Sequence, residues 1–485
     1  MISTLVDDLV VGLNDGLIQG DVDGHRYVFN PRGHHGVMLL PKEAYQVFVC
    51  CSKAFNISDI KTALPWARTH PWKLIDLLNL LGRRGILNLG REFSEHCEAQ
   101  QRQLRKQGMT VWLQMTDACN LRCSYCYISK KPTHMNPETA QALMLKIAKE
   151  CRQAGYDSLL FKFAGGEPTT RWRTVKELVD WADAGLKNMP FKTTFLIVTN
   201  GTSFPSDLID YAASGKLKLS ISLDGTRQWH DKHRVYQDGQ GSFCDVDRNI
   251  ELLLRRGIRV AVSCTITKDN VNGLTEFAQY CVERDLTFRF SPYRQPFASR
   301  ESLKSENKTL IEELGRCYGW LENHLPARSL YEVHRFADID LRRPRMQLCG
   351  IGSNAIAITS DGQVCLCPFD LDNPIGNGLK SNIVQILKSQ DRYLPKENRV
   401  DLIPVCQDCK WRFTCAAGCP QYRKEQFGTF RHASPYCEVY QAILPILVRL
   451  HAVQLLRPGS ATIPTYPSMK EDVQGIDAAA GMGSE

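Results

Sequence analysis

Between about residues 109 and 300, short apolar runs alternate with longer amphipathic ones. Six runs of strand type span residues 110–116, 159–164, 193–199, 217–222, 259–265 and 287–291. Segments with apolar residues at helical spacing lie between them, at residues 137–154, 173–188, 207–214, 243–256 and 273–284. Strands that alternate with helices predict a parallel sheet with right-handed crossovers. We therefore expect an α/β fold, a partial barrel of six strand–helix units that binds ligands at the carboxyl ends of its strands.

Residues 1–95 have a different pattern. Short apolar runs at residues 25–29 and 36–40 are followed by helical segments at 42–51, 57–64 and 71–84, and residues 85–89 predict a final strand. Strands followed by about three helices and a wing indicate a small winged-helix unit. A helical cap or a DNA-binding winged helix stays open as an alternative. The adjacent Cys50 and Cys51 are expected to be buried as small apolar side chains.

The remaining segments differ mainly in polarity. Residues 96–108 are polar with charges of both signs and predict a solvent-facing helical linker. Residues 301–345 are charged and helical, and predict a bridge to a cysteine-rich region at 346–455, which ends in an apolar helix. Residues 456–485 are dominated by glycine, proline, serine and alanine, which predicts a disordered tail.

Composition narrows the possible functions. A chain of 485 residues with 43% hydrophobic residues can fill two or three cores. The net charge of +8 includes no run of five basic residues, so nucleic acid is not required as a partner. The 19 cysteines and the absence of a signal-peptide pattern predict a reducing cytoplasm. We also expect no membrane-spanning helix, since the sequence contains no apolar stretch of 18 or more residues.

The candidate chemistry begins in the loop after the first predicted strand, at Cys119-x3-Cys123-x2-Cys126. Three thiols can hold three irons of a cubane cluster and leave the fourth iron open to a ligand. Zinc is the alternative, but zinc takes four ligands and the next candidate ligand, His134, lies eight residues further on.

This motif, with the aromatic Tyr125 before its last cysteine, resembles the signature of the radical S-adenosylmethionine (SAM) superfamily. The resemblance implies that the three thiolates bind a [4Fe–4S] cluster, and that the amine and carboxylate of SAM chelate its fourth iron. One-electron cleavage of SAM would then give a 5′-deoxyadenosyl radical that takes hydrogen from unactivated carbon. Tyr125 would lie beside the adenine.

Polar and glycine residues at later strand ends extend the resemblance. It implies that Gly165-Gly166-Glu167-Pro168 contacts the SAM amine, that Ser222 and Asp224 lie near the ribose and amine, and that Arg234 pairs with the SAM carboxylate. Asn200, at the end of the third strand, also suits a polar contact to SAM. Asn-Gly and Asp-Gly are common turn formers as well, so each of these residues has an ordinary alternative role.

The C-terminal third carries a second cysteine pattern. Cys349-x12-Gly362-x4-Cys367 is followed by Cys406-x2-Cys409-x5-Cys415-x3-Cys419 and by Cys437. The order resembles the SPASM domain, the auxiliary-cluster module of radical SAM enzymes that modify peptides and proteins. The resemblance implies an outer cluster on Cys406, Cys409, Cys415 and Cys437, and an inner cluster on Cys349, Cys367 and Cys419. A pair of zinc sites is the alternative.

The inner set is one ligand short. Residues 340–348 contain no cysteine, so Cys365 or Cys317 could complete it, or an open iron could bind substrate. Asp370, three residues after Cys367, could take a proton from a substrate but is equally suited to a loop. We therefore assign no catalytic residue from the sequence.

These resemblances predict a maturase of a ribosomally made peptide. Residues 1–95 resemble a PqqD-like peptide-recognition domain, in which a leader peptide adds a strand to a sheet edge. We expect hydrogen abstraction from the core peptide and a carbon–carbon or thioether crosslink, with a flavodoxin or ferredoxin as reductase. One alternative acts on a protein, in sulfatase formylglycine formation or quinohemoprotein amine dehydrogenase crosslinking. Another is a zinc-binding winged-helix regulator, although its recognition helix, residues 71–84, would carry Asp76 and many leucines.

Overall fold

The computed structural model describes residues 9–33, 36–53, 55–89, 108–294, 302–389 and 398–457. The linker expected at residues 96–108 and the tail expected at residues 456–485 lie almost wholly outside these ranges.

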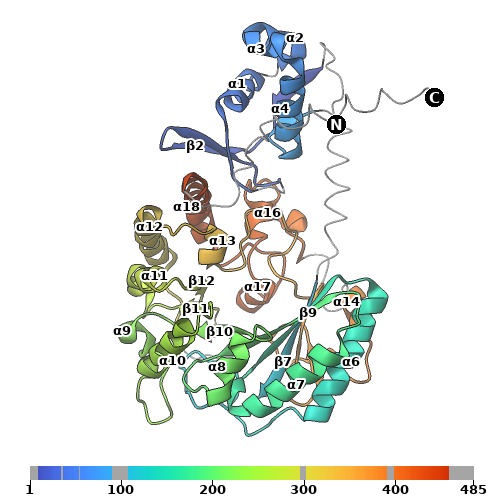
Figure 1. Cartoon of the computed structure of the whole chain (residues 1–485), viewed down its shortest axis with the longest axis vertical. Helices are drawn as coiled ribbons and strands as arrows, with labels where there is room; N and C mark the ends of the chain where they lie inside the picture. The colour runs from blue at the N-terminus through green and yellow to red at the C-terminus, as the bar shows by residue number, and fades with distance from the viewer. Residues whose placement is uncertain are drawn as a thin grey trace, which may run out of the picture.

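The six predicted barrel strands are all present, and neighbouring strands pair in parallel and in sequence order. They are β7 (Met109–Thr116), β8 (Ser158–Gly165), β9 (Lys192–Thr199), β10 (Lys218–Ser222), β11 (Ala261–Ile266) and β12 (Thr287–Pro292). The helices that cover their outer face in Figure 1 are α6 (Pro137–Ala154), α7 (Trp172–Gly185), α8 (Ser206–Ala213), α10 (Phe243–Arg255) and α11 (Leu274–Glu283). Short helical turns fill three loops: η1 (Pro168–Arg171), α9 (Arg227–His230) and η2 (Val271–Gly273). The α/β partial barrel predicted from the hydrophobic pattern is therefore confirmed.

The sheet continues beyond the barrel at both edges. Four strands that the pattern did not predict extend it: β13 (His334–Phe336), β14 (Ala355–Ile358), β15 (Gln363–Cys365) and β16 (Gly376–Asn377). Strand β13 pairs in parallel with β12, and β14 pairs in parallel with β7, in the order β13-β12-β11-β10-β9-β8-β7-β14-β15-β16. Because β14 lies beside β7, the C-terminal cysteines come close to the loop that follows the first barrel strand.

The rest of the C-terminal part is helical. Its elements are α12 (Asn307–Asn323), α13 (Leu330–Val333), α14 (Ile383–Lys388), η4 (Val400–Leu402), η5 (Pro404–Cys406), α16 (Arg412–Cys415), α17 (Pro420–Phe427) and α18 (Cys437–Leu456). The apolar faces of α12 and α18 join the same hydrophobic core as the barrel strands. The barrel and the cysteine-rich region therefore share one core.

Helix α18 corrects the expectation that no segment could span a membrane. The helix has 20 residues, and an 18-residue window within it has a mean hydropathy of 1.5, so it is long and apolar enough to do so. However, 56% of the apolar window is buried inside the protein. Arg449 within this helix forms an ion pair of 2.8 Å with Glu322 of α12. This burial is typical of the core helix of a folded domain.

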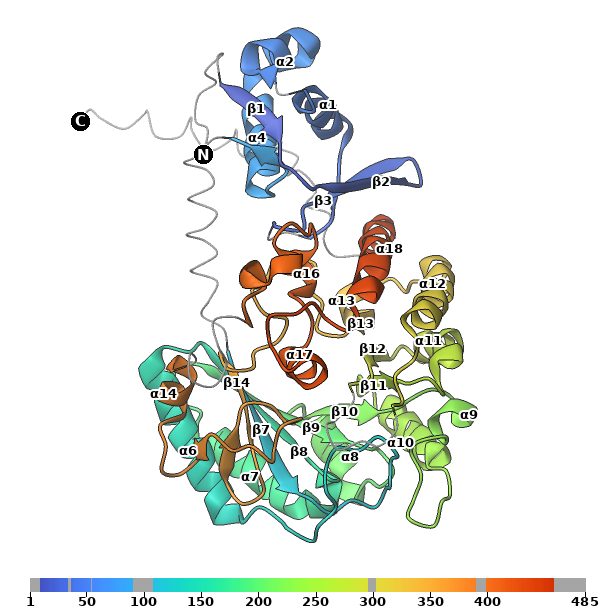
Figure 2. The same cartoon turned by 180° about the vertical axis from the view of Figure 1, so that it is seen from behind.

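The N-terminal region forms two small sheets and a helical bundle, which Figure 2 shows above the cysteine-rich region. One sheet has the order β5-β1-β6, from β1 (Val10–Leu13), β5 (Phe55–Asn56) and β6 (Leu87–Asn88). The other has the order β2-β3-β4, from β2 (Ile18–Val22), β3 (His25–Phe29) and β4 (Met38–Leu39). The helices are α1 (Lys42–Cys51), α2 (Ile57–Ala63), α3 (Pro65–Thr69) and α4 (Pro71–Arg83). Strands β1, β2 and β5 were not predicted.

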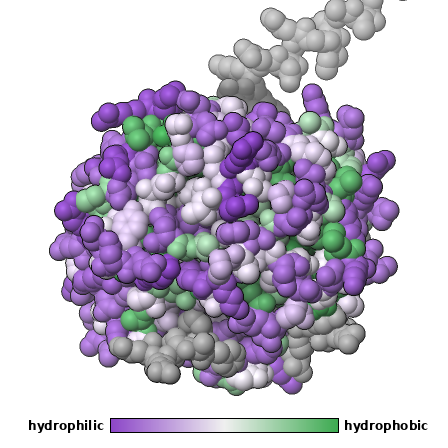
Figure 3. Space-filling model, turned by 90° about the horizontal axis from the view of Figure 1, so that it is seen from below, coloured by the Kyte–Doolittle hydropathy of each residue, from purple (hydrophilic) through white to green (hydrophobic). Residues whose placement is uncertain are grey.

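The two parts of this region pack differently. The helices have a core of their own, in which Cys50 and Cys51 are buried as expected. The β2-β3-β4 sheet instead packs on the cysteine-rich region: the rings of Phe29 and Trp411 stack with centroids 6.2 Å apart, and Arg449 donates to the carbonyl oxygen of Asp21 at 2.9 Å. On the face shown in Figure 3, apolar residues are scattered between polar ones.

Candidate functional site

A cavity of about 2170 Å³ opens inside the partial barrel and contains most of the predicted site. Its lining includes six of the predicted cluster cysteines, from both motifs: Cys119, Cys123, Cys126, Cys349, Cys367 and Cys419. Among the predicted SAM contacts, it also includes Tyr125, Gly165, Gly166, Asn200, Ser222 and Arg234. Tertiary structure thus brings together residues up to 300 positions apart in the sequence.

The first cysteine loop is held by hydrogen bonds to the ends of neighbouring strands. Asn200, at the end of β9, donates to the Asn120 side chain at 2.8 Å and to Cys119 Sγ at 3.8 Å. Lys130 Nζ donates to Cys126 Sγ at 2.9 Å, and the Leu121 N–H donates to Cys119 Sγ at 3.4 Å. Donors aimed at sulfur stabilise thiolates, which are the form that binds iron.

The two glycines at the end of β8 let the cysteine loop approach the sheet closely. Gly165 has a φ of 131°, and a Cβ there would lie 2.2 Å from the carbonyl oxygen of Thr116. A Cβ on Gly166 would lie 2.0 Å from the carbonyl oxygen of Ala118. The Gly166 N–H donates to Thr116 O at 2.6 Å. Only glycine fits this contact, so the pair sets the position of the loop.

Glu167 has a role that the sequence did not indicate. Its side chain is buried and accepts hydrogen bonds from the Thr169 N–H and hydroxyl, the Thr199 hydroxyl and the Asn200 N–H, at 2.7–3.0 Å. It thereby joins the ends of β8 and β9. Glu167 and Pro168 do not line the cavity, whereas the preceding glycines do. The contact of Glu167 with the SAM amine stays a prediction.

Asp224 and Arg234 form a buried ion pair below the cysteine loop. Arg234 Nε lies 2.8 Å from Asp224 Oδ2, and Asp224 Oδ1 accepts from the Thr265 N–H at 2.9 Å. The Tyr125 hydroxyl donates to the same carboxylate, and the Arg234 guanidinium lies 5.4 Å from the centre of the Tyr125 ring. Burial acts to raise the pKa of Asp224, but Arg234 and its other partners bring it below the usual value. The carboxylate is thus held ionised, and it orients Tyr125 and Arg234 along the cavity.

Two histidines near this pair were missed by sequence reasoning. His233 links the cysteine loop to the barrel, because its ring nitrogens contact the Ser124 hydroxyl at 2.6 Å and the Thr267 hydroxyl at 2.8 Å. His230 contacts Ser242 at 3.0 Å, and burial lowers its pKa to about 3, so it stays neutral. The only available signal was the cluster of charged and imidazole residues at 230–234, from which Arg234 alone was selected.

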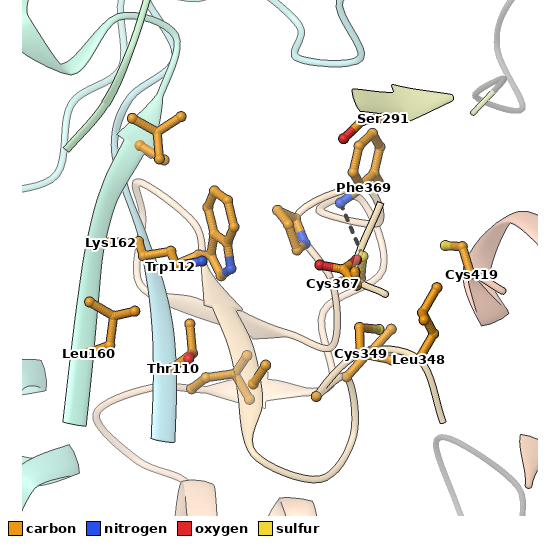
Figure 4. Close-up of a pocket in the computed structure, with 18 of the residues that line it drawn as sticks. Thr110, Trp112, Leu160, Lys162, Ser291, Leu348, Cys349, Cys367, Phe369 and Cys419 are labelled. Carbon is orange, nitrogen blue, oxygen red and sulfur yellow. Dashed lines mark hydrogen bonds between the residues drawn. The ribbon is translucent and has the colours of Figure 1, made fainter. Parts of the chain in front are cut away.

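The inner cysteine set lies across the cavity from β7 and β8 (Figure 4). The Phe369 N–H donates to Cys367 Sγ at 3.5 Å. Cys317 and Cys365, the two cysteines considered as a fourth ligand of the inner cluster, do not line the cavity. The Cys317 thiol contacts Leu274 O in the barrel core, and the Cys365 thiol contacts Leu371 O. Asp370 does not line it either, whereas Asp338 does.

The outer set lines a second, smaller cavity formed by Cys406, Cys409, Cys415 and Cys437. Ala416 and Ala417, directly after Cys415, have φ values of 44° and 56°. Left-handed alanines cost about 1–3 kcal/mol each, so the surrounding structure must hold this turn in place. The turn directs Cys415 toward the outer cavity and leaves Cys419 for the inner one.

The thiols of each set line the same cavity, but they do not converge on a common point as the ligands of a single metal ion would. In the described ranges, no group of three His, Cys, Asp or Glu side chains is close enough together to hold a single metal ion. Ligands of a cubane cluster bind different irons, so a wider spread of thiols fits a cluster.

Comparisons with known proteins show which domains contribute the residues of these cavities. The family model of the radical SAM superfamily matches residues 113–281. The SPASM model, described as an iron–sulfur cluster-binding domain, matches residues 349–410. The chain carries a radical SAM domain and a SPASM domain. The radical SAM domain implies a [4Fe–4S] cluster with SAM, and the SPASM domain implies auxiliary iron–sulfur clusters.

Among curated proteins, a cysteine-type anaerobic sulfatase-maturating enzyme from Clostridium novyi is 24% identical over 67% of this chain and 91% of its own. The mycofactocin maturase MftC of Mycolicibacterium smegmatis is 27% identical over 63% of this chain and 76% of its own.

Solved structures support the radical SAM/SPASM fold. An anSMEcpe structure with bound AdoMet and a peptide covers 72% of this chain and 99% of its own, at a TM-score of 0.60 and 20% identity. Streptococcus suis SuiB bound to precursor peptide SuiA covers 88% of this chain and 100% of its own, at a TM-score of 0.52 and 13% identity.

Proposed function

We propose that this protein is a radical SAM maturase that binds a ribosomally made precursor peptide and installs an oxidative crosslink in it. The observation that carries the proposal is a large cavity in the described structure, because the cysteines expected to hold the SAM cluster and those expected to hold the inner auxiliary cluster line the same space. A volume of about 2170 Å³ can admit a peptide segment as well as SAM.

The cofactors supply the radical chemistry. When bound, the SAM cluster supplies a 5′-deoxyadenosyl radical that takes hydrogen from unactivated carbon, and auxiliary clusters can accept an electron. Cys119, Cys123 and Cys126 would hold the first cluster. Crosslink formation is an oxidation, and the inner set of Cys349, Cys367 and Cys419 would hold an electron acceptor at the cavity wall.

The protein's own residues prepare the cavity. Asp224 fixes the position of the Arg234 guanidinium, which is suited to a carboxylate. Tyr125 lines the cavity and offers an aromatic ring for contact with a base. Gly165 and Gly166 expose backbone to the ligand. Together these groups favour the binding of a ligand in which an amino acid is joined to a nucleoside, and SAM is such a ligand.

The N-terminal region supports a leader-binding role. The β2-β3-β4 sheet has two edge strands, and such edges accept an extended peptide through backbone hydrogen bonds. The sheet sits directly on the SPASM region through Phe29 and Trp411, so a leader bound there would begin near the cysteine-rich wall. The likeness to SuiB extends over 88% of the chain, against 72% for anSMEcpe, which favours a counterpart of this region in a peptide-modifying enzyme.

A protein substrate is the second candidate. The sulfatase-maturating relatives cover 91% or more of their own length, and they favour modification of a protein side chain. The match covers 67% of this chain, so about a third of the chain has no counterpart in these relatives, and we assign part of that third to the N-terminal region. The match of residues 349–410 to an iron–sulfur domain argues against the zinc-binding regulator.

The test is anaerobic reconstitution of the full chain, followed by incubation with dithionite, SAM and a candidate precursor peptide that carries its leader. We expect about twelve irons per chain if three cubane clusters form, 5′-deoxyadenosine, and a peptide that has lost a pair of hydrogens. Leader binding is measured separately by hydrogen–deuterium exchange. Protection of residues 18–22 or 38–39 supports the edge-strand proposal, and protection elsewhere contradicts it.

Two outcomes would redirect the assignment. Turnover of a sulfatase-derived peptide, with no effect of a leader, would favour the protein-substrate enzyme. Stoichiometric zinc with neither sulfide nor 5′-deoxyadenosine would refute the radical mechanism.

A further inference from the structure

The cavity has a strong excess of positive charge. Eleven of its lining residues are arginine or lysine, and two, Asp157 and Asp338, are carboxylic acids. Several cations have partners there: Lys130 contacts Cys126, Arg234 pairs with Asp224, and Arg294 lies near the inner cysteines. Arg342 and Arg399 are paired as well, with the carboxylates of Asp340 and Asp401 outside the lining. The cations that matter for a ligand are therefore those whose charge or donors have no such partner.

Lys162 is a lining cation that projects from a central strand of the barrel. It lies on β8 directly opposite Trp112 of β7, and both side chains line the cavity. Its ammonium group lies 4.5 Å from the centre of the Trp112 ring. Figure 4 shows the Lys162 side chain pointing toward this ring. Within the described ranges, Lys162 makes no hydrogen bond and no ion pair. Burial and the nearby Arg289 lower the pKa of Lys162 to about 8.

Arg289 approaches the same space from β12. Its Nη2 lies 2.9 Å from Asp338, but its Nε is buried without a hydrogen-bond partner in the described structure. Two cations that face one cavity repel each other, and the single carboxylate of Asp338 is already engaged by Arg289. An anionic group between Lys162 and Arg289 would relieve this repulsion and satisfy the buried donor.

We propose that Lys162 and Arg289 form a subsite for a carboxylate of the peptide substrate. This inference rests on the proposed function and specifies its substrate as a peptide with an acidic residue, or with its own C-terminal carboxylate, close to the modified residue. The subsite is separate from the Arg234 position expected to meet SAM, because Lys162 lies on β8 and Arg234 follows β10.

The distance along β8 sets how close the acidic group must be. Lys162 is three residues before Gly165, which places it about 10 Å along the strand from the SAM end of the cavity, at about 3.3 Å per residue. An extended peptide covers that distance in about three residues. The carboxylate would therefore lie within about three residues of the reacting carbon.

The test measures binding alone, so that it succeeds or fails independently of radical turnover. Reconstituted full-length enzyme with SAM is titrated calorimetrically with three alanine–serine heptapeptides of one length. The first has a central glutamate and both ends blocked, the second has glutamine in its place, and the third has glutamine and a free C-terminal carboxylate. The two carboxylate peptides distinguish a side-chain source from a C-terminal source.

Wild-type enzyme is expected to bind at least one carboxylate peptide about tenfold more tightly than the blocked glutamine peptide, the effect of one charge-assisted hydrogen bond. Lys162→Met should remove this preference, and Lys162→Arg should retain most of it. The matched control is Lys216→Met, which removes a half-exposed lysine paired with Asp180 on the barrel surface and should behave as wild type.

Equal binding of all three peptides by wild-type enzyme, or no measurable binding of either carboxylate peptide, would overturn the proposal. A preference that persists in Lys162→Met would do the same. Cluster absorbance and thermal unfolding of each variant report whether it is folded. If Lys162→Met is not folded, Lys162→Gln is the replacement variant, with the same expected loss.

Discussion

Replacement of Asp224 by asparagine removes one charge from the most buried ion pair of the site. The Asp224 side chain is fully buried and that of Arg234 is 9% exposed, with Nε and Oδ2 2.8 Å apart. Asparagine keeps the shape and can still accept from the Thr265 N–H. However, it leaves the Arg234 guanidinium as a buried cation without a counterion.

The expected cost follows from that burial. Breaking a buried ion pair by removing one partner costs about 3–5 kcal/mol, because the remaining charge stays desolvated. At about 2 °C per kcal/mol, Tm should fall by roughly 6–10 °C. The matched control is Asp210→Asn, which breaks an exposed pair with Arg256 of 2.7 Å and should cost less than about 1 kcal/mol.

The assay is thermal and urea unfolding of anaerobic protein, together with equilibrium binding of SAM. The Asp224→Asn variant should bind SAM more weakly, because Arg234 and Tyr125 lose the acceptor that orients them. The pKa of Asp224 is lowered, so its contribution is fully present above the unfolded aspartate pKa of about 3.9 and is lost as the pH falls through the folded value. The stability difference between wild type and variant should therefore be constant from pH 5 to 8. A loss no larger than that of Asp210→Asn would refute the reasoning.

Three further predictions concern the loop, the inner cysteines and the buried glutamate. Gly166→Ala puts a Cβ 2.0 Å from a backbone oxygen. This variant should lose about four irons per chain. The control, Gly319→Ala on α12, places its Cβ in open space and should keep them. Equal iron in both variants would contradict the argument that the cysteine loop must approach Gly166 closely. Cys367→Ala should lose auxiliary iron while Cys365→Ala keeps it, as iron and sulfide analysis would show; loss in both would make Cys365 a ligand. Glu167→Gln turns an acceptor into a donor facing the Asn200 N–H and should cost about 1–3 kcal/mol in urea unfolding; an unchanged midpoint would mean that the amide finds other partners.

The sequence by itself determined the barrel, and it predicted which cysteines would hold the clusters. The six barrel strands could be predicted because apolar runs with helices between them have few alternatives to a parallel sheet. The cysteine motifs were readable because cluster ligands need fixed short spacings within one loop. Strands β13 and β14 were missed, since three or four residues of His-Arg-Phe or Ala-Ile-Ala-Ile carry no periodicity of their own and become strands only beside β12 and β7.

The tertiary structure alone decided how these parts combine. Pairing of β14 with β7 places the two cysteine sets on one cavity, and no local pattern encodes that pairing. Glu167 became a link between two strands, and Lys162 became a cavity cation, because each side chain's role depends on which neighbours the fold supplies. The spacing of cysteines within one loop can be seen in the sequence. The burial of a side chain and the charges around it depend on segments that are distant in the sequence and meet only in the folded protein.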